Sequence, residues 1–264
     1  MLELQGIRKT FYPGTPNEKK ALNGVDLHLN AGDFVTIVGS NGAGKSTLFN
    51  AISGVFSVDE GTIRLDSKNI TNMKEYKRAY DIGRLFQDTM KGTAPNMTIE
   101  ENLALAYSRK AGKSFFAVNK QDREYFTELL KQLDLGLESR MKAKVGQLSG
   151  GQRQAVSLLM STISQPKLLL LDEHTAALDP ATARKVLDIT TRIVSEGRIT
   201  TMMITHDMQA ALTLGNRTIM MDDGKIIFDI SGEERAKMTV EDLLECYHEN
   251  SRKKLTNEIG RAHV

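Results

Sequence analysis

Short stretches near the start of the chain alternate hydrophobic and polar residues, which is the period of a strand with one buried face. Residues 2–7 and 22–29 alternate in this way, and a loop containing Pro and Gly separates them at residues 13–20. Residues 62–66 repeat the alternation. The pattern predicts a small antiparallel β subdomain in the first part of the chain.

Other hydrophobic runs do not alternate, which is typical of parallel strands covered on both faces. They span residues 34–38 and 168–171, and a further strand is expected at residues 200–204. Before this last strand, one helical face carries Val186, Ile189, Ile193 and Val194. Strands that alternate with helices predict an α/β core with a parallel sheet, and residues 222–225 read as a hairpin turn that closes it.

The middle of the chain, from residue 87 to about residue 164, has helical periodicity. One helical face consists of Phe126, Leu129, Leu130 and Leu133. The last helix of this region is mostly hydrophobic and is expected to be buried. We expect a helical subdomain inserted into the α/β core.

The end of the chain, residues 233–264, is expected to be a helical extension of a domain that covers residues 1–232. Residues 239–242 have the Thr-x-x-Asp pattern of a helix N-terminus. A hydrophobic stripe follows at Val240, Leu243, Leu244 and Tyr247. We expect the stripe to pack on the same chain, and self-association through it is the alternative.

Composition limits the function classes that need to be considered. The chain has 264 residues with 40% hydrophobic and 26% charged side chains, as in ordinary globular proteins. Lys and Arg total 35 against 33 Asp and Glu, so the net charge of +2 gives no strong field for a nucleic acid. No run approaches the roughly 20 hydrophobic residues that span a bilayer, and no signal peptide is visible. With a single cysteine, Cys246, the chain is expected in a reducing, cytosolic compartment.

Basic and aromatic residues are interleaved between residues 109 and 123. They are Arg109, Lys110, Lys113, Phe115, Phe116, Lys120 and Arg123. Such a stretch can bind a lipid surface or a single-stranded nucleic acid. We favour a solvated connection within the helical subdomain.

Residues 39–46 match the Gly-x-x-x-x-Gly-Lys-Ser pattern of a phosphate-binding loop. The expected strand at residues 34–38 precedes the loop, and a helical hydrophobic face follows at Leu48, Phe49 and Ile52. This order places backbone N–H groups and a helix N-terminus around phosphate oxygens. We expect the nucleotide to contact Gly39, Ser40, Asn41, Gly42, Ala43, Gly44, Lys45, Ser46 and Thr47.

A second anion-binding turn lies far downstream, at Leu148, Ser149, Gly150, Gly151 and Gln152. A Ser that caps a helix and two following glycines leave backbone N–H groups accessible at the helix N-terminus. One nucleotide cannot obviously use both turns of one chain.

Two acidic residues, Asp172 and Glu173, end the hydrophobic run at residues 168–171. Ligands of open α/β sheets bind at the carboxyl ends of the strands. We expect Lys45 to neutralise phosphate charge, and Asp172 and Ser46 to bind Mg²⁺. Glu173 is expected to orient or deprotonate the water that attacks the γ-phosphate.

With these motifs, residues 1–230 resemble the ATP-binding cassette (ABC) ATPases, which are the nucleotide-hydrolysing subunits of ABC transporters. The resemblance implies a P-loop NTPase fold and identifies the turn at residues 148–152 as the signature of the family. It implies that Gln87 is the Q-loop glutamine, which senses Mg²⁺ and the membrane partner. It also implies that Leu178 and Asp179 form the D-loop and that His206 is the switch histidine on the γ-phosphate.

The resemblance further implies an aromatic residue that stacks on adenine near the N-terminus. Phe11 is favoured for this role and Tyr12 is the alternative. The chain departs from the family at His174, where many relatives have Pro, and at Ala176, where a D-loop Ser is common. Neither departure removes a catalytic group.

The family mechanism implies a homodimer in which the phosphate loop of one subunit and the signature of the other enclose one ATP with Mg²⁺. The expected partners are integral-membrane permease subunits and an extracytoplasmic substrate-binding protein, and the expected location is the cytoplasmic face of the membrane. The leading hypothesis is an importer related to amino-acid importers. A soluble ABC ATPase that serves ribosomes or DNA repair, and the ATPase of an exporter, are the alternatives.

Overall fold

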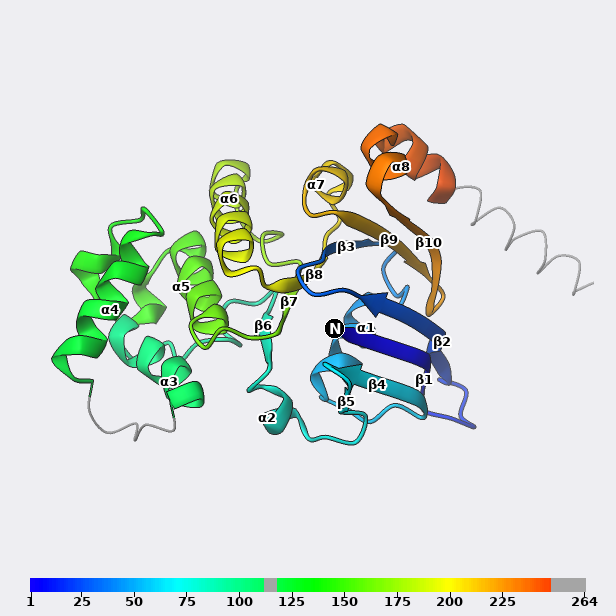
Figure 1. Cartoon of the computed structure of the whole chain (residues 1–264), viewed down its shortest axis with the longest axis horizontal. Coiled ribbons are helices and arrows are strands. Elements are labelled where there is room, and N and C mark those ends of the chain that lie inside the picture. The colour runs from blue at the N-terminus through cyan, green and yellow to red at the C-terminus, as the bar shows by residue number, and fades with distance from the viewer. Residues whose placement is uncertain (112–117, 248–264) are drawn as a thin grey trace, which may run out of the picture. The chain divides into compact units, whose positions relative to one another are not determined.

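The computed structural model describes residues 1–111 and 118–247 (Figure 1). The chain divides into two compact units. The first unit consists of Met1–Met73 and Met202–Val264, and the second consists of Lys74–Thr201. The second unit is therefore inserted, in sequence, between two parts of the first. The subdomain boundaries expected at residues 87, 164 and 232 stay predictions.

An antiparallel sheet in the first unit has the strand order β2-β1-β4-β5 (Figure 1). Its strands are β1 (Leu2–Phe11), β2 (Lys19–Leu29), β4 (Glu60–Leu65) and β5 (Lys68–Asn69). Leu2 is the partner of both Leu29 and Leu65. Leu2, Leu4 and Ile7 of β1 are at most 2% exposed, so the alternation in the sequence corresponds to one buried face. The antiparallel sheet predicted from the sequence is confirmed.

The strand that leads into the phosphate loop, β3 (Phe34–Val38), is buried along its whole length. It runs parallel to β9 (Arg217–Asp222), with Val35 opposite Arg217. The hairpin predicted at residues 222–225 is confirmed, because β10 (Lys225–Ser231) pairs antiparallel with β9. The helices α1 (Lys45–Ser53), α7 (Met208–Thr213) and α8 (Gly232–Lys237) belong to the same unit.

In the second unit, β6 (Ile82–Leu85) runs parallel to β7 (Leu168–Asp172), with Ile82 opposite Leu168. Leu168, Leu169, Leu170 and Leu171 are 0% exposed, as expected for a strand covered on both faces. The helix α6 (Pro180–Gly197) buries Val186, Ile189 and Val194, which confirms most of its predicted hydrophobic face. The short α2 (Glu75–Arg78) precedes β6, and β8 (Thr200–Ile204) follows α6.

The predicted helical region is confirmed between β6 and β7. It contains α3 (Ile99–Ala111), α4 (Lys120–Lys131), α5 (Gly150–Thr162) and two short 3-10 helices, η1 (Leu137–Arg140) and η2 (Val145–Gln147). Phe126, Leu130 and Leu133 are 0% exposed and form the core of this region. None of the described helices is long and hydrophobic enough to cross a membrane.

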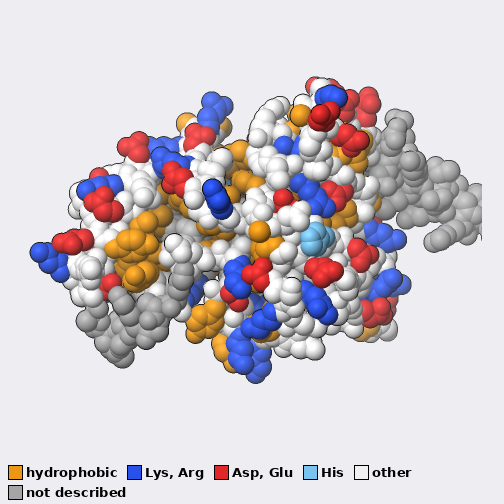
Figure 2. All heavy atoms as spheres, in the orientation of Figure 1, with side chains coloured by type: hydrophobic (Ala, Val, Ile, Leu, Met, Phe, Trp, Pro, Cys, Tyr) orange, Lys and Arg blue, Asp and Glu red, His pale blue; other side chains and the backbone are white. Residues whose placement is uncertain are grey.

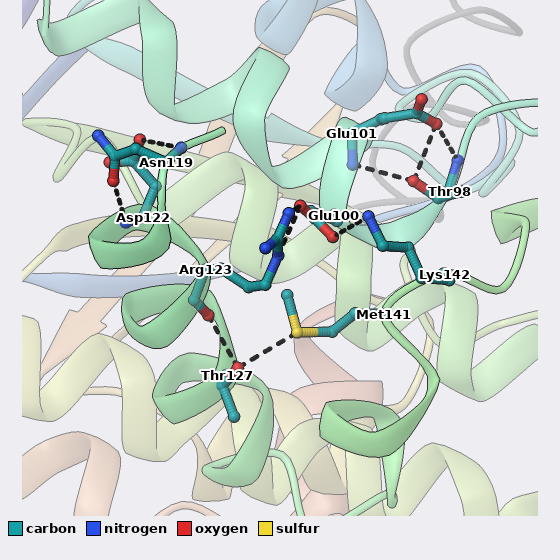
Figure 3. Close-up of polar contacts among 9 residues, drawn as sticks. All are labelled: Thr98, Glu100, Glu101, Asn119, Asp122, Arg123, Thr127, Met141 and Lys142. Atoms are coloured by element: carbon teal, nitrogen blue, oxygen red, sulfur yellow. Dashed lines mark hydrogen bonds and ion pairs between the residues drawn. The ribbon is translucent and has the colours of Figure 1, made fainter. Parts of the chain in front are cut away.

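A buried carboxylate joins three segments of the helical region (Figure 3). Glu100 on α3 is 3% exposed. Its Oε1 lies 2.8 Å from Arg123 Nη2 on α4, and its Oε2 lies 2.8 Å from Lys142 Nζ, in the segment that leads to residue 148. Burial raises the pKa of Glu100, but the hydrogen bonds and charges of Arg123 and Lys142 hold that pKa below its usual value. Arg123 of the basic stretch is therefore an ion-pair partner of Glu100 and stays half exposed. Lys113, Phe115 and Phe116 of that stretch lie outside the described residues.

The C-terminal extension packs on the first unit over its described part. The predicted helix start is confirmed, because the Asp242 amide donates to Thr239 Oγ1 (3.2 Å) and the Thr239 amide donates to Asp242 Oδ2 (2.8 Å). Leu243 is 0% exposed and clusters with Val38, Ala211 and Met220. Tyr247 packs against the same cluster, whereas Leu244 is 38% exposed, so half of the predicted stripe packs on its own chain in this cluster. Residues 248–264 of the expected extension lie outside the described residues.

Arg235 of α8 is 9% exposed and fastens the extension to two other elements. Its guanidinium donates to Thr218 Oγ1 on β9 (2.8 Å). It also donates to the carbonyls of Ala211, Leu214 and Gly215, at the C-terminal end of α7. Unsatisfied carbonyls at a helix C-terminus favour a positive charge, so Arg235 stabilises this end of α7.

Candidate nucleotide-binding site

The phosphate loop lies between β3 and α1 and depends on three glycines with positive φ. Gly39, Gly42 and Gly44 have φ of 147°, 84° and 102°, conformations that other residues adopt at a cost. A β-carbon on Gly44 would also lie 2.6 Å from the Ala21 carbonyl oxygen, and one on Gly39 would collide with the Met221 carbonyl oxygen. The bare backbone of this loop can approach a bound phosphate closely, as the sequence pattern requires.

Lys45, the first residue of α1, directs its ammonium group back into the loop. Its side chain is 5% exposed. Nζ donates to the carbonyls of Gly39 (2.8 Å) and Ser40 (3.0 Å). Ser46 is exposed and Thr47 is half-buried in the same turn of α1. A buried ammonium group, an exposed hydroxyl and a helix N-terminus therefore lie together in this loop. This combination fits the negative charge and the oxygen atoms of a nucleoside triphosphate.

The segment around His206 lies beside the strand that leads into this loop. The Thr205 amide donates to the Ile37 carbonyl (3.1 Å), and Ile37 lies close to Gly39 in the sequence. Asp207 caps α7, because its Oδ1 accepts from the Ala210 amide (3.0 Å). Within the first unit, the structure thus brings the predicted switch segment to the strand of the phosphate loop.

The two aromatic candidates for adenine stacking have different surroundings. Phe11 at the end of β1 packs edge to face on Phe56, with ring centroids 5.4 Å apart. Lys9 Nζ lies 5.8 Å from the centroid of the Phe11 ring. Tyr12 follows β1, has a positive φ of 53° and is 69% exposed. Phe11 is the half-buried, better-fixed ring of the two.

In the second unit, Asp172 and Gln87 emerge at the same edge of the β6-β7 pair. Leu85, the last residue of β6, is opposite Leu171, so the two strands end side by side. Gln87 is exposed. The Gln154 amide nitrogen on α5 donates to the Phe86 carbonyl (3.5 Å), which ties the chain before Gln87 to the last helix of the helical region. These positions agree with the carboxyl-edge location expected for ligand-binding residues.

A residue that the sequence analysis missed lies next to Asp172. Arg84 Nη2 on β6 is 3.6 Å from Asp172 Oδ2, and both side chains are largely buried. Burial lowers the pKa of the Arg84 guanidinium, and the charge of Asp172 opposes this effect. The Arg84 guanidinium also lies 4.6 Å from the centroid of the Phe86 ring. Arg84 is the charged residue within the otherwise uncharged strand β6, and this position was the sequence signal that could have identified it.

Glu173 follows Asp172 with a φ of 46°, a left-handed conformation that is uncommon for a residue other than glycine. The Ala176 amide donates to the Glu173 carbonyl (3.0 Å) and closes a turn. The next residue, His174, is 3% exposed. A buried imidazole therefore directly follows Glu173 in this turn.

The predicted signature turn begins α5. The Gln152 amide donates to Ser149 Oγ (3.3 Å) and the Ser149 amide donates to Gln152 Oε1 (3.3 Å), so these side chains form a capping box. Leu148 is 4% exposed. Ser149 and Gly150 are exposed at the helix N-terminus, which leaves this end of the helix accessible to an anion.

The signature glycines face the predicted D-loop and the first turn of α6. A β-carbon on Gly150 would lie 3.1 Å from Leu178 Cδ2, and one on Gly151 would collide with Thr182 Cγ2. Asp179 caps α6, because its Oδ1 accepts from the Thr182 amide (3.1 Å). Hydrogen bonds from Thr182 hold the pKa of Asp179 below its usual value. The structure therefore brings the signature and the D-loop together within one chain.

Comparison with known proteins gives the same motifs a family context. The model of the ABC transporter family matches residues 22–176. A tyrosine transport ATP-binding protein of Clostridioides difficile is 42% identical over 94% of this chain and 98% of its own length. The methionine import ATP-binding protein MetN of Clostridium tetani is 32% identical over 86% of this chain and 68% of its own length.

Solved structures of ATP-binding cassettes share the fold. The cassette MJ1267 in its ADP conformation aligns with a TM-score of 0.77 and 30% identity, over 94% of this chain and 98% of that chain. A dimer of the cassette MJ0796, bound to ADP and Pi after hydrolysis, aligns with a TM-score of 0.76 and 30% identity, over 88% of this chain and 98% of that chain.

Proposed function

This chain belongs to the ABC transporter family and is an ATPase of that family, and we propose that it is the ATP-hydrolysing subunit of an amino-acid importer. The observation that carries the ATPase mechanism in this proposal is the presence of two anion-binding turns in one chain. One is the phosphate loop before α1, and the other is the signature turn that begins α5. A transport ATPase of this family uses both turns only when two copies come together.

The first turn binds the phosphates of ATP. Backbone N–H groups of the loop and the N-terminus of α1 hold the phosphate oxygens. Lys45 leaves the Gly39 and Ser40 carbonyls and neutralises charge on the β- and γ-phosphates. Phe11 stacks on the adenine ring, and its packing on Phe56 fixes the position of the ring.

The residues present fit a magnesium ion, which prefers oxygen ligands and keeps some of its water. Ser46 would supply a hydroxyl, Asp172 a carboxylate and Gln87 an amide oxygen. When bound, the ion would neutralise part of the phosphate charge. Arg84 pairs with Asp172 at the end of β7, where this carboxylate would serve as a ligand.

The hydrolytic step is assigned to two side chains. Glu173 orients the attacking water and accepts a proton from it. His206 contacts the γ-phosphate and supports the charge that develops on it. Backbone contacts beside both residues support the assignment, because the Ala176 amide closes a turn on the Glu173 carbonyl and the Thr205 amide donates to Ile37 of β3.

The second turn acts on the ATP of a partner copy. Ser149 and the backbone of Gly151 reach the γ-phosphate that is held by the phosphate loop of the other subunit. ATP then favours the closed dimer because it binds this state more tightly, and loss of the γ-phosphate reopens it. The post-hydrolysis dimer of MJ0796 supports this part of the proposal by similarity.

The transport role and its cargo are proposed from the relatives. The names of two of them refer to tyrosine transport and methionine import. We infer that this chain powers separate permease subunits at the cytoplasmic face of the membrane, together with a substrate-binding protein. Reconstitution in vesicles with the membrane permease subunits that co-purify with the chain, followed by a measurement of ATP-dependent uptake of labelled tyrosine, tests the cargo. Uptake that is unchanged by ATP would contradict it.

The proposed function is tested by Glu173→Gln, with Glu196→Gln on the exposed side of α6 as the matched control. The first variant is expected to bind ATP, to lose most of its hydrolysis and to accumulate as an ATP-bound dimer in size-exclusion chromatography. The control is expected to behave as the wild type. Near-normal turnover of Glu173→Gln would overturn the assignment.

A further inference from the structure

His174 makes a specific contact that the proposed chemistry does not use. Its imidazole is 3% exposed, and Nε2 lies 3.3 Å from Oγ1 of Thr190 on α6. Thr190 is 1% exposed, so both ends of this contact are removed from water.

The hydrogen-bond pattern determines which ring nitrogen carries the proton. Thr190 Oγ1 donates to the Val186 carbonyl (2.7 Å). A hydroxyl has one proton to donate, so towards His174 the Thr190 oxygen acts as the acceptor. His174 Nε2 therefore bears the hydrogen and donates it to Thr190. This bond restrains the orientation of the imidazole.

This contact acts on the residue beside it. Glu173 has a left-handed φ of 46°, a conformation that persists only when surrounding contacts impose it. The amide of Ala176 fixes the carbonyl side of Glu173 (3.0 Å). Directly after Glu173, the His174 side chain contacts Thr190 of α6. Two contacts thus restrain the backbone that aims the Glu173 carboxylate.

The helix that receives His174 also packs on the signature turn. Thr182, in the first turn of α6, lies against Gly151, and Leu178 lies against Gly150. The helix α6 therefore contacts Gly151 of the signature turn at Thr182 and the residue after Glu173 at Thr190.

We propose that His174 is a positioning residue that holds Glu173 in its hydrolytic orientation by donating a hydrogen bond to Thr190 of α6. The inference rests on the proposed function, because it assigns Glu173 to the hydrolytic step. It gives a role to the residue that replaces the proline common in relatives.

The test compares ATP hydrolysis by Thr190→Val, which removes the acceptor, with Thr190→Ser, which keeps it. Thr190→Val is expected to lower kcat about tenfold, because a small displacement of a catalytic group is costly. ATP affinity is expected to stay within about twofold, since no phosphate contact changes. Thr190→Ser is expected to restore most of kcat. Thr191→Val, the same change at the next residue of α6, is the matched control and is expected to retain the wild-type rate.

A double-mutant cycle separates positioning from general loss of structure. His174→Ala is expected to slow hydrolysis, and addition of Thr190→Val is expected to cause little further loss, because both remove the same bond. Thermal unfolding of each variant shows that the protein is folded at the assay temperature. An unchanged kcat in folded Thr190→Val, or an equal loss in Thr190→Ser, would overturn the inference.

The outcomes also separate this inference from the proposed function. Normal hydrolysis by Glu173→Gln would contradict the function itself. Loss of hydrolysis in Glu173→Gln, together with a full rate in Thr190→Val, would contradict only the role of His174. In the Glu173→Gln background, Thr190→Val is expected to leave the residual rate unchanged, because the carboxylate that it positions is absent.

Discussion

The methyl carbon Cγ2 of Thr182 occupies the space that a β-carbon on Gly151 would need. Gly151 is buried in the first turn of α5, and Thr182 lies in the first turn of α6. The glycine is therefore required for close packing between the signature turn and the D-loop helix, in addition to any contact with phosphate. Substitution of Thr182 can separate the packing role of Gly151 from any role in phosphate binding.

Gly151→Ala is expected to lower the free energy of unfolding by about 1–3 kcal/mol, because the added methyl group overpacks the contact with Thr182. Thr182→Ser removes Cγ2, so the double variant is expected to recover most of this stability. Urea denaturation measures both effects. Gly150→Ala, which would meet the movable end of Leu178, is the control and is expected to cost less. A double variant as unstable as Gly151→Ala would show that another contact is responsible.

Lys45→Ala is expected to weaken ATP binding by about 10- to 100-fold, because it removes a charge-assisted bond to the phosphates. Hydrolysis is expected to fall with it. Isothermal titration with a non-hydrolysable ATP analogue measures the affinity. Lys68→Ala, at an exposed position of β5, serves as the control. Wild-type affinity in Lys45→Ala would mean that this ammonium does not bind phosphate.

Glu100→Gln tests the buried ion cluster of the helical region (Figure 3). At pH 7 the variant is expected to lose about 1–2 kcal/mol of unfolding free energy, discounted because the side chains of Arg123 and Lys142 are 49% and 75% exposed. The pKa of Glu100 is lower in the folded than in the unfolded protein, so its contribution is complete above the unfolded value of 4.5 and is lost as the pH falls through the folded value. The difference between wild type and variant should therefore shrink below pH 4.5. Urea denaturation at neutral and acidic pH checks this, and a difference that is constant with pH would contradict it.

Arg235→Met is expected to lower the free energy of unfolding by about 2–3 kcal/mol, because the carbonyls at the end of α7 lose a buried donor. Methionine keeps much of the hydrophobic stem, so the loss reports on the hydrogen bonds. Lys237→Met on the same helix is the control, since Lys237 is 79% exposed and pairs only with Glu233 among the described residues. Thermal or urea denaturation distinguishes the two. Equal stability of Arg235→Met and the wild type would contradict the capping role.

Features set by neighbouring residues could be predicted from the sequence. The alternation in β1 and the unbroken hydrophobic runs of β3 and β7 report directly on which faces are buried. The phosphate loop was identified because its glycines, lysine and serine are consecutive. The capping box at Ser149 is equally local, since its two partners are three residues apart.

Features that depend on distant residues could not be predicted in this way. Glu100 lies in an acidic first turn of α3, as is common for exposed helix starts. Only the positions of Arg123 and Lys142 explain why it is buried. Arg84 lies in a strand too short for a periodic signal, and its ion pair with Asp172 requires the parallel register of β6 and β7. Thr190, the partner of His174, is sixteen residues away on α6, so the sequence alone does not show this contact.

The central claim is that each ATP is held by the phosphate loop of one subunit and the signature turn of another. Mixing two inactive variants, Lys45→Ala and Ser149→Arg, tests it most directly. A mixed dimer has one site in which both turns are defective and one in which both are intact. The account predicts that the mixture hydrolyses ATP although neither variant does so alone. A mixture that stays inactive while mixed dimers form with ATP would contradict it.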